Sequence, residues 1–116
     1  MIRDASAVPD VDGAMRAFFE SLEEGVTADN TSMLSAALFS TGAYAAGFCF
    51  ARQAWEIQPL HQYAGVNVLR CLKAMGRQEE ASLFLSKFQE KQPVLDAWGE
   101  AQVSECRSWI KELEAK

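Results

Sequence analysis

Few residues of this chain could carry out chemistry. Histidine occurs once, as His61, and the three cysteines, Cys49, Cys71 and Cys106, lie far apart and form no C-x-x-C pair. A hydrolytic site needs a nucleophile with a base or paired carboxylates in a pocket, and a zinc site needs local pairs of ligands. We therefore predict no catalytic site and no metal site, and we interpret the cysteines as reduced thiols of a hydrophobic core.

The remaining polar candidates have ordinary structural explanations. His61 follows Pro59 and Leu60 at a predicted helix start, where it would be an exposed or capping residue. Glu79 and Glu80 begin another predicted helix, where carboxylates interact favourably with the helix dipole. The glycines separate helical segments, and none follows a strand as a phosphate-binding loop would. We therefore expect a protein that is not an enzyme and that binds no cofactor.

Length, composition and charge narrow the possible partners. The 116 residues suffice for one domain, and the hydrophobic share of 49% is that of a globular protein. A formal net charge of −5 disfavours nucleic acid and anionic membrane surfaces, because little of the chain would neutralise phosphates. The N-terminal residues include no apolar stretch of signal-peptide length, and no segment approaches the ~20 apolar residues of a membrane span. We therefore expect a cytoplasmic location, no nucleic acid and no membrane.

Apolar residues recur with helical spacing along the chain, and alternating strand patterns are absent. A first helix is predicted from Pro9–Asp10 to Gly25, with Asp10 or Asp12 available as its cap. Its apolar stripe comprises Val11, Met15, Phe18 and Leu22. Five further helices are predicted over residues 31–40, 44–57, 62–74, 78–91 and 95–113. The chain is therefore predicted to be all-α.

Two segments of the chain repeat each other at an offset of 34 residues. The run GAYAAGFCFARQAWEIQP, which starts at Gly42, aligns without a gap with GRQEEASLFLSKFQEKQP, which starts at Gly76. The same offset of 34 relates Pro59 to Pro93, Leu38 to Leu72 and Leu34 to Val68. A helix–turn–helix unit of this length cannot bury its apolar side alone, so it stacks on copies of itself.

The repeat resembles the tetratricopeptide (TPR) family. The residues that fit the family pattern are Leu34, Gly42, Tyr44, Ala54 and Pro59 in the first copy and Val68, Leu72, Gly76, Ala81 and Pro93 in the second. Glycine admits a left-handed turn, small residues let the two helices approach closely, and proline ends the unit. The chain departs from the family pattern at Thr31, Gly47, Gly65 and Gln78.

This resemblance implies a short TPR-like helical solenoid, in which two helix–turn–helix repeats are flanked by an N-terminal and a C-terminal helix. It divides the single domain into an N-terminal helix (1–27), a first repeat (28–61), a second repeat (62–95) and a C-terminal capping helix (96–116). The alternative is a helical bundle without repeats.

The resemblance also implies a binding surface. In such proteins, helix A residues that face away from helix B line a concave groove that holds another polypeptide. By position these residues are Met33, Ala36 and Phe39 in the first copy and Tyr63, Val66, Asn67, Arg70 and Lys73 in the second. A groove of this composition could accept an amphipathic helix or an extended strand, with Arg70 or Lys73 meeting an acidic residue of the ligand. For Phe39 and Tyr63, a place in the core is an equal alternative.

One subtype of the family is disfavoured by the same positions. TPR modules that grip the C-terminal carboxylate of heat-shock chaperones use Lys, Asn and Arg at fixed helix A positions. This chain has Asp29, Ser32, Met33 and Ala36 at those positions of the first copy, and Asp29 would repel a carboxylate. Asn67 alone is compatible.

Two functional hypotheses follow, and both make another protein chain or peptide the partner. The first is a small cytosolic chaperone or adaptor, since the chain is similar in format to the small TPR-fold chaperones of bacterial type III secretion. The second is a structural scaffold subunit that self-associates through its terminal helices. Its candidate contact clusters are Phe18, Phe19 and Leu22 near one end and Trp98, Trp109 and Ile110 near the other. Under either hypothesis the chain could be part of a homo- or hetero-oligomer.

Overall fold

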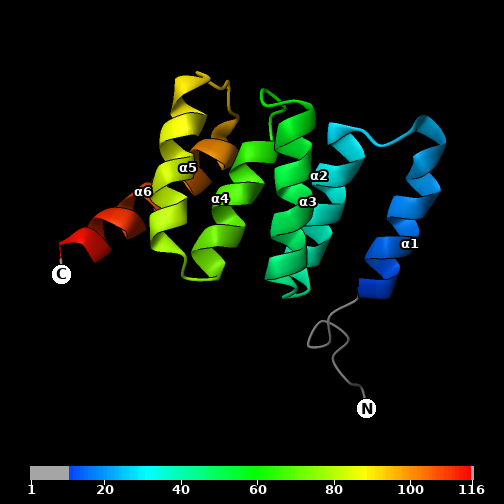
Figure 1. Ribbon diagram of the computed structural model, residues 1–116, viewed down its shortest axis with the longest axis horizontal. Helices are drawn as coiled ribbons and strands as arrows, with labels where there is room; N and C mark the ends of the chain where they lie inside the picture. The colour runs from blue at the N-terminus through cyan, green and yellow to red at the C-terminus, as the bar shows by residue number, and fades with distance from the viewer. Residues whose placement is uncertain (1–10, 116) are drawn as a thin grey trace, which may run out of the picture.

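The polypeptide runs up and down as a row of helices, which the computed structural model describes for residues 11–115 (Figure 1). These residues form α1 (Val11–Ser21), a 3-10 turn (Leu22–Glu24), α2 (Ala28–Ser40), α3 (Tyr44–Ile57), α4 (Ala64–Ala74), α5 (Gln78–Glu90) and α6 (Ala97–Glu114). No strand occurs in this range, so the all-α prediction is confirmed. The predicted cap Asp10 lies outside the described residues, whereas Asp12 stands in the first turn of α1.

The helix ends follow local sequence signals. α3 has the predicted bounds, whereas α2 begins at Ala28, earlier than predicted, because Thr27 and Asn30 form a capping box. The Thr27 hydroxyl accepts a hydrogen bond from the Asn30 N–H at 3.0 Å, and the Thr27 N–H donates to the Asn30 side chain at 2.9 Å. Gly42 and Gly76 have φ of 88° and 71° and turn the chain between α2 and α3 and between α4 and α5. The predicted turn glycines are therefore confirmed.

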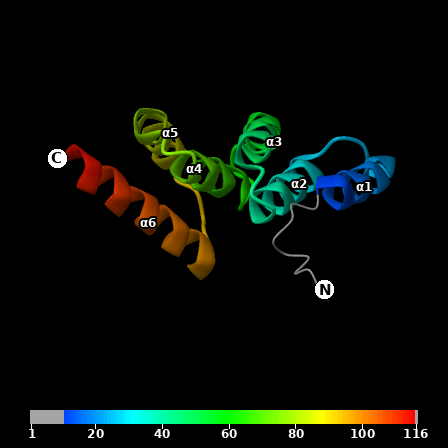
Figure 2. The same ribbon diagram turned by 90° about the horizontal axis from the view of Figure 1, so that it is seen from below.

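The helices form two layers. Seen from below, α3 and α5 lie along one side and α2 and α4 along the other, while α6 crosses beneath α4 (Figure 2). α2, α4 and α6 contact one another in that order, and α4 also packs against α3 and α5. We call α3 and α5 the outer helices. Between them, the rings of Trp55 and Phe84 meet edge to face, with their centres 4.8 Å apart.

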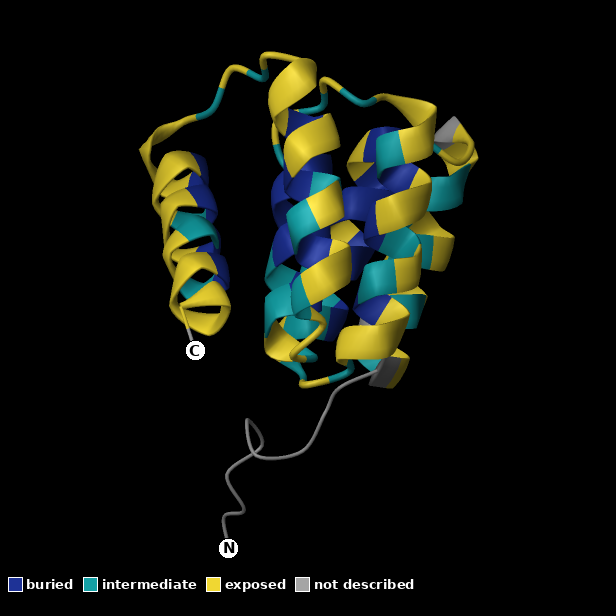
Figure 3. Cartoon of the chain, turned by 60° about the vertical axis from the view of Figure 1, so that its left-hand side comes forward, coloured by how far each residue is buried: buried dark blue, intermediate teal, exposed yellow. Residues whose placement is uncertain are grey.

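Burial repeats along the chain at the offset found in the sequence. Ser35, Leu69 and Val103 are successive buried positions 34 residues apart, and Leu38, Leu72 and Cys106 form a second such series. The C-terminal helix α6 thus takes a place equivalent to those of α2 and α4. We call these three the inner helices. The side of α6 turned away from the other helices is exposed (Figure 3).

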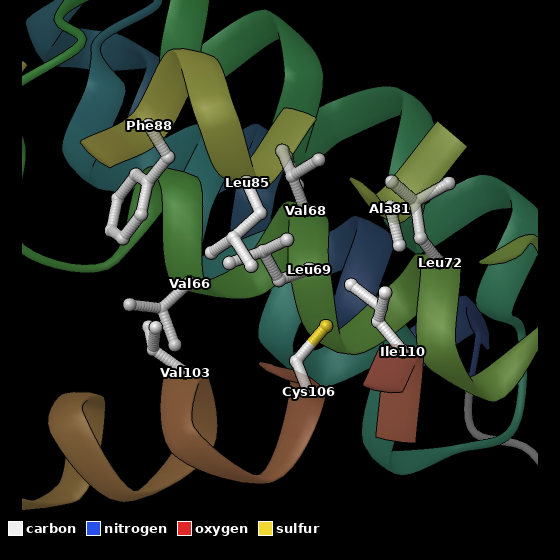
Figure 4. Close-up of a cluster of buried hydrophobic side chains, with 11 residues drawn as sticks. Val66, Val68, Leu69, Leu72, Ala81, Leu85, Phe88, Val103, Cys106 and Ile110 are labelled. Atoms are coloured by element: carbon white, nitrogen blue, oxygen red, sulfur yellow. The ribbon is translucent and has the colours of Figure 1, made fainter. Parts of the chain in front are cut away.

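One hydrophobic core joins both predicted repeats and α6 (Figure 4). Its members are Ala51, Val66, Val68, Leu69, Leu72, Ala81, Leu85, Phe88, Val103, Cys106 and Ile110. Val66 is 0% exposed and stands beside Val103 of α6, so its predicted place in the groove is wrong. The physical reason is that α6 lies over this side of α4 and removes Val66 from solvent.

The cysteine prediction holds for two of the three residues. Cys71 and Cys106 are buried free thiols, but Cys49 is an exposed free thiol on α3, so its predicted place in the core is wrong. Burial raises the pKa of the Cys71 thiol from 9.0 to about 11, and burial also raises the pKa of the Cys106 thiol. Both buried thiols therefore remain protonated and unreactive at neutral pH.

Candidate functional site

A cavity of about 510 Å³ opens between α2, the α3–α4 connection, α4 and the start of α6. It is lined by Asp29, Ser32, Met33, Ala36, His61, Tyr63, Asn67, Arg70, Asp96 and Trp98. Five of the eight predicted groove residues are among them: Met33, Ala36, Tyr63, Asn67 and Arg70. This size is typical of ligand sites, so this first cavity is the main candidate site.

A second cavity of about 490 Å³ adjoins the first at Arg70, which lines both. Its lining comprises Phe39, Arg70, Lys73, Ala74, Gln102, Glu105, Cys106 and Trp109. This second cavity therefore contains two more of the predicted groove residues, Phe39 and Lys73, which leaves only Val66 outside both cavities. We call the two cavities together the inner groove, which follows α4 from its first turn to its last.

Arg70 lies at the junction of the two cavities, between two aromatic rings. Its guanidinium carbon is 4.0 Å from the ring centre of Phe39 and 4.9 Å from that of Trp98. Cation–π contacts of this kind hold a guanidinium in a fixed plane. Burial lowers the pKa of the Arg70 side chain, and the Cys71 thiol partly opposes this effect, but an arginine remains charged at neutral pH.

Trp98 is fixed over Arg70 by a short network at the start of α6. The Tyr63 ring meets the Trp98 ring edge-on at 5.8 Å, and the Tyr63 hydroxyl donates a hydrogen bond to Asp96 at 3.2 Å. The other oxygen of Asp96 accepts the Gly99 N–H at 2.7 Å and so caps α6. The Asp96 carboxylate raises the pKa of Tyr63, first through the hydrogen bond from the Tyr63 hydroxyl and second through its negative charge.

Trp98 was not among the predicted groove residues, although the sequence contains a signal for it. The offset of 34 residues, continued into the last helix, relates Trp98 to Ala64 at the start of α4. This relation marks Trp98 as an inner-helix residue. The predicted second repeat ends at residue 95, before the last helix, so the prediction did not include Trp98.

His61 links the two predicted repeats at the rim of the first cavity. Its Nε2 lies 2.7 Å from Asp29 Oδ1, and its Nδ1 accepts the Tyr63 N–H at 3.2 Å. Since a backbone N–H can only donate, Nδ1 carries no proton and Nε2 donates to Asp29. Both ring nitrogens are thus used in structural hydrogen bonds. Tyr63, the N-cap of α4, receives no side-chain cap, and the His61 side chain is 10% exposed, so His61 is neither the exposed nor the capping residue that was expected.

The floor of the first cavity joins α4 to α2. Asn67 is 3% exposed, and its side-chain amide donates to the backbone oxygen of Ser32 at 3.3 Å. Asn67 therefore ties the helices together more than it presents a group to solvent. The Ser32 hydroxyl is buried and has no hydrogen-bond partner among the described residues.

Across residues 11–115, no group of three or more His, Cys, Asp or Glu side chains could hold a metal ion. The helices in the described part of the chain are too short or too polar to cross a bilayer.

The chain was compared with known proteins at the levels of sequence and structure. No protein-family model, no curated protein and no solved structure matches it. The functional interpretation therefore depends on the repeat, the inner groove and the residues within it.

Proposed function

We propose that this chain is a non-catalytic, TPR-like protein-binding module whose inner groove holds a helical or extended segment of a partner polypeptide. The observation that carries the proposal is Arg70, stacked between Phe39 and Trp98 at the centre of a groove with an exposed apolar rim. Met33 at this rim is 68% exposed, and Trp98 is 41% exposed. Apolar walls with a few fixed polar groups are typical of peptide-binding grooves.

The dimensions of the groove suit a short segment. α4 has 11 residues, which correspond to an axial length of about 16 Å at the usual helical rise. A bound helix of about three turns, or an extended stretch of about five residues, would cover this length. The partner would thus be recognised through a linear segment.

A small cytoplasmic chaperone or adaptor is the biological role that we favour. In size, acidity and helical format the chain is similar to the small TPR-fold chaperones of type III secretion. By that resemblance the partner would be an aggregation-prone chain with an amphipathic helix, and the groove would cover the apolar side of this helix. A non-catalytic role fits the engagement of His61, the single histidine, in two structural hydrogen bonds.

A matched pair of variants tests this proposal. Met33→Glu places a charge at the groove rim, whereas Leu83→Glu does so on α5, in the other helical layer, at a side chain of similar exposure (70%). Each tagged full-length protein is expressed in the native host, and co-purified chains are quantified by mass spectrometry. We expect a partner that wild type and Leu83→Glu retain equally and that Met33→Glu retains at least about tenfold less. Equal retention by all three proteins would place the partner outside the groove and refute the proposal.

Self-association remains a second candidate because of one exposed side chain on α1. Phe19 is 61% exposed, while its neighbour Phe18 packs against Phe50 with ring centres 5.8 Å apart. In the opposite cluster Ile110 is 5% exposed and Trp109 packs partly on the core, so Trp98, which is 41% exposed and lines the inner groove, is its most accessible side chain. A Phe19→Glu variant measured by multi-angle light scattering decides this candidate. A wild-type oligomer that becomes a monomer supports it, and an unchanged mass rejects it.

A further inference from the structure

The charged groups of the first cavity differ in whether they have partners. Asp29 interacts with His61, and Asp96 accepts hydrogen bonds from the Tyr63 hydroxyl and from the first turn of α6. The ion pairs within residues 11–115 join Arg52 to Glu56 and Arg77 to Glu80, whereas His61, whose Nδ1 carries no proton, meets Asp29 through a hydrogen bond. Neither ion pair includes Arg70, whose guanidinium has aromatic neighbours but no carboxylate partner in the described part of the chain.

The surroundings of Arg70 restrict what could become its partner. The Phe39 and Trp98 rings face the guanidinium, so the N–H groups at its edge are the donors that a ligand can use. A planar, pre-oriented edge with several donors matches a carboxylate, which accepts two parallel hydrogen bonds. Because Arg70 lines both cavities, a ligand in the inner groove can reach this edge.

Partial burial makes such a partner favourable. Removal from water lowers the pKa of Arg70, which means that the charged form is poorly solvated where it stands. The aromatic rings compensate for part of this cost. A carboxylate at the guanidinium edge would compensate for the rest and would be held more strongly than at an exposed arginine.

We propose that Arg70 binds the carboxylate of one Asp or Glu side chain in the bound polypeptide segment, next to an apolar residue that packs on Met33 and Trp98. This inference rests on the proposed function and adds the chemistry of the ligand. The segment carries a single acid at this point and no acidic run, because the carboxylates of Asp29 and Asp96 line the same cavity and would repel further acids. Lys73 adds positive charge in the second cavity, and Glu105 limits acidic residues there.

The probe for this proposal is a phage-displayed library of random 16-residue peptides, selected on the full-length chain. Enriched peptides are synthesised with a fluorescent label, and each is compared with a version in which its acid is changed to the amide. With wild type, we expect the Glu→Gln or Asp→Asn peptide to bind about 10- to 100-fold more weakly. With Arg70→Gln, the same peptide change should alter binding by less than about threefold, because the partner of the acid is gone.

Two further variants separate the ionic contact from general effects. Arg52→Gln removes the same charge from an exposed position on α3 and should leave the binding of both peptides at wild-type levels. Arg70→Lys keeps the charge but loses the paired donors, so it should retain only part of the preference for the acidic peptide. Circular dichroism shows whether Arg70→Gln is folded. If it is not, the reduced preference of Arg70→Lys for the acidic peptide tests the proposal instead.

The possible failures are distinguishable. If peptides bind and Met33→Glu abolishes binding, but the acid-to-amide change has the same effect with wild type and Arg70→Gln, the Arg70 proposal is wrong and the groove function stands. Selected peptides without a shared acidic position lead to the same conclusion. If no peptide binds, or if Met33→Glu leaves binding unchanged, both the proposed function and the role of Arg70 are refuted.

Discussion

Replacing Gly65 by alanine should destabilise this chain, although alanine is the better helix former. Gly65 stands in the first turn of α4, and a methyl group there would lie 2.3 Å from two ring carbons of Phe88 and 3.2 Å from a ring carbon of Trp55. Ordinary carbon contacts lie at about 3.5–4.0 Å. Phe88 is 2% exposed and is stacked on Phe84 at 6.2 Å, so its ring has little room to move away. Gly65 therefore sets how closely α5 and α3 approach α4.

The size of the effect follows from two opposing terms. An extra methyl group in a filled core costs about 1–3 kcal/mol, and an overlap of more than 1 Å places Gly65→Ala at the upper end. The gain in helix propensity is about 1 kcal/mol. We therefore expect a net loss of about 2 kcal/mol, which lowers the melting temperature by roughly 10 °C.

The assay is urea unfolding followed by far-ultraviolet circular dichroism, in a double-mutant cycle with Phe88→Leu. A leucine at this position can rotate away from the new methyl group, so Gly65→Ala should cost at least about 1 kcal/mol less in the Phe88→Leu background. Gly99, the equivalent position in α6, provides a control because its nearest neighbours are 3.3 Å and 3.4 Å away. If Gly65→Ala instead stabilises the chain by the propensity term alone, the close approach of α4 and α5 is incorrect.

Three further predictions concern a turn, a cap and a buried thiol. Gly76→Ala should cost about 1–2 kcal/mol in urea unfolding, because φ of 71° strains any residue with a Cβ while no atom obstructs the methyl group. Asp96→Asn should preserve the α6 cap but lower the pKa of Tyr63 toward its usual value in an ultraviolet titration, whereas Asp96→Ala should also cost about 1 kcal/mol of stability. Burial raises the pKa of the Cys71 thiol from 9.0 in the unfolded chain to about 11 in the folded chain. The contribution of this protonated thiol to the free energy of unfolding is therefore complete below pH 9.0. It is lost, by up to about 2–3 kcal/mol, as the pH rises through 11. Unfolding midpoints measured across this range should fall more steeply for wild type than for Cys71→Ala, and in native protein a thiol reagent should modify Cys49 alone.

Much of the local structure could be predicted because its causes lie close together in the sequence. Helical periodicity, the turn glycines at 42 and 76, and the prolines that follow α3 and α5 all act within a few residues. The bounds of α3 and the start of α5 were predicted to the residue for this reason. The start of α2 was misplaced because residues 27–30 were predicted to be a linker with capping residues, whereas Thr27 is the N-cap and the helix begins directly after it.

The candidate site was predictable in part, from the same repeat. The resemblance to the TPR family implies, by position, eight groove residues, and seven of these eight line the inner groove. Val66 was misplaced, while His61, Asp96 and Trp98 were not predicted to line the groove. Each of these differences involves His61 in the α3–α4 connection or the docking of α6, and neither position relative to α4 follows from the repeat.

The sequence by itself determined the helices, their turns and the 34-residue offset at which buried positions recur. Only the tertiary structure decided that α6 packs across α4, which buries Val66 and sets Trp98 over Arg70. It likewise decided that His61 meets Asp29, a residue 32 positions earlier. The physical reason is that periodicity and capping reflect interactions within one or two helical turns, whereas the pairing of distant side chains depends on how whole helices dock.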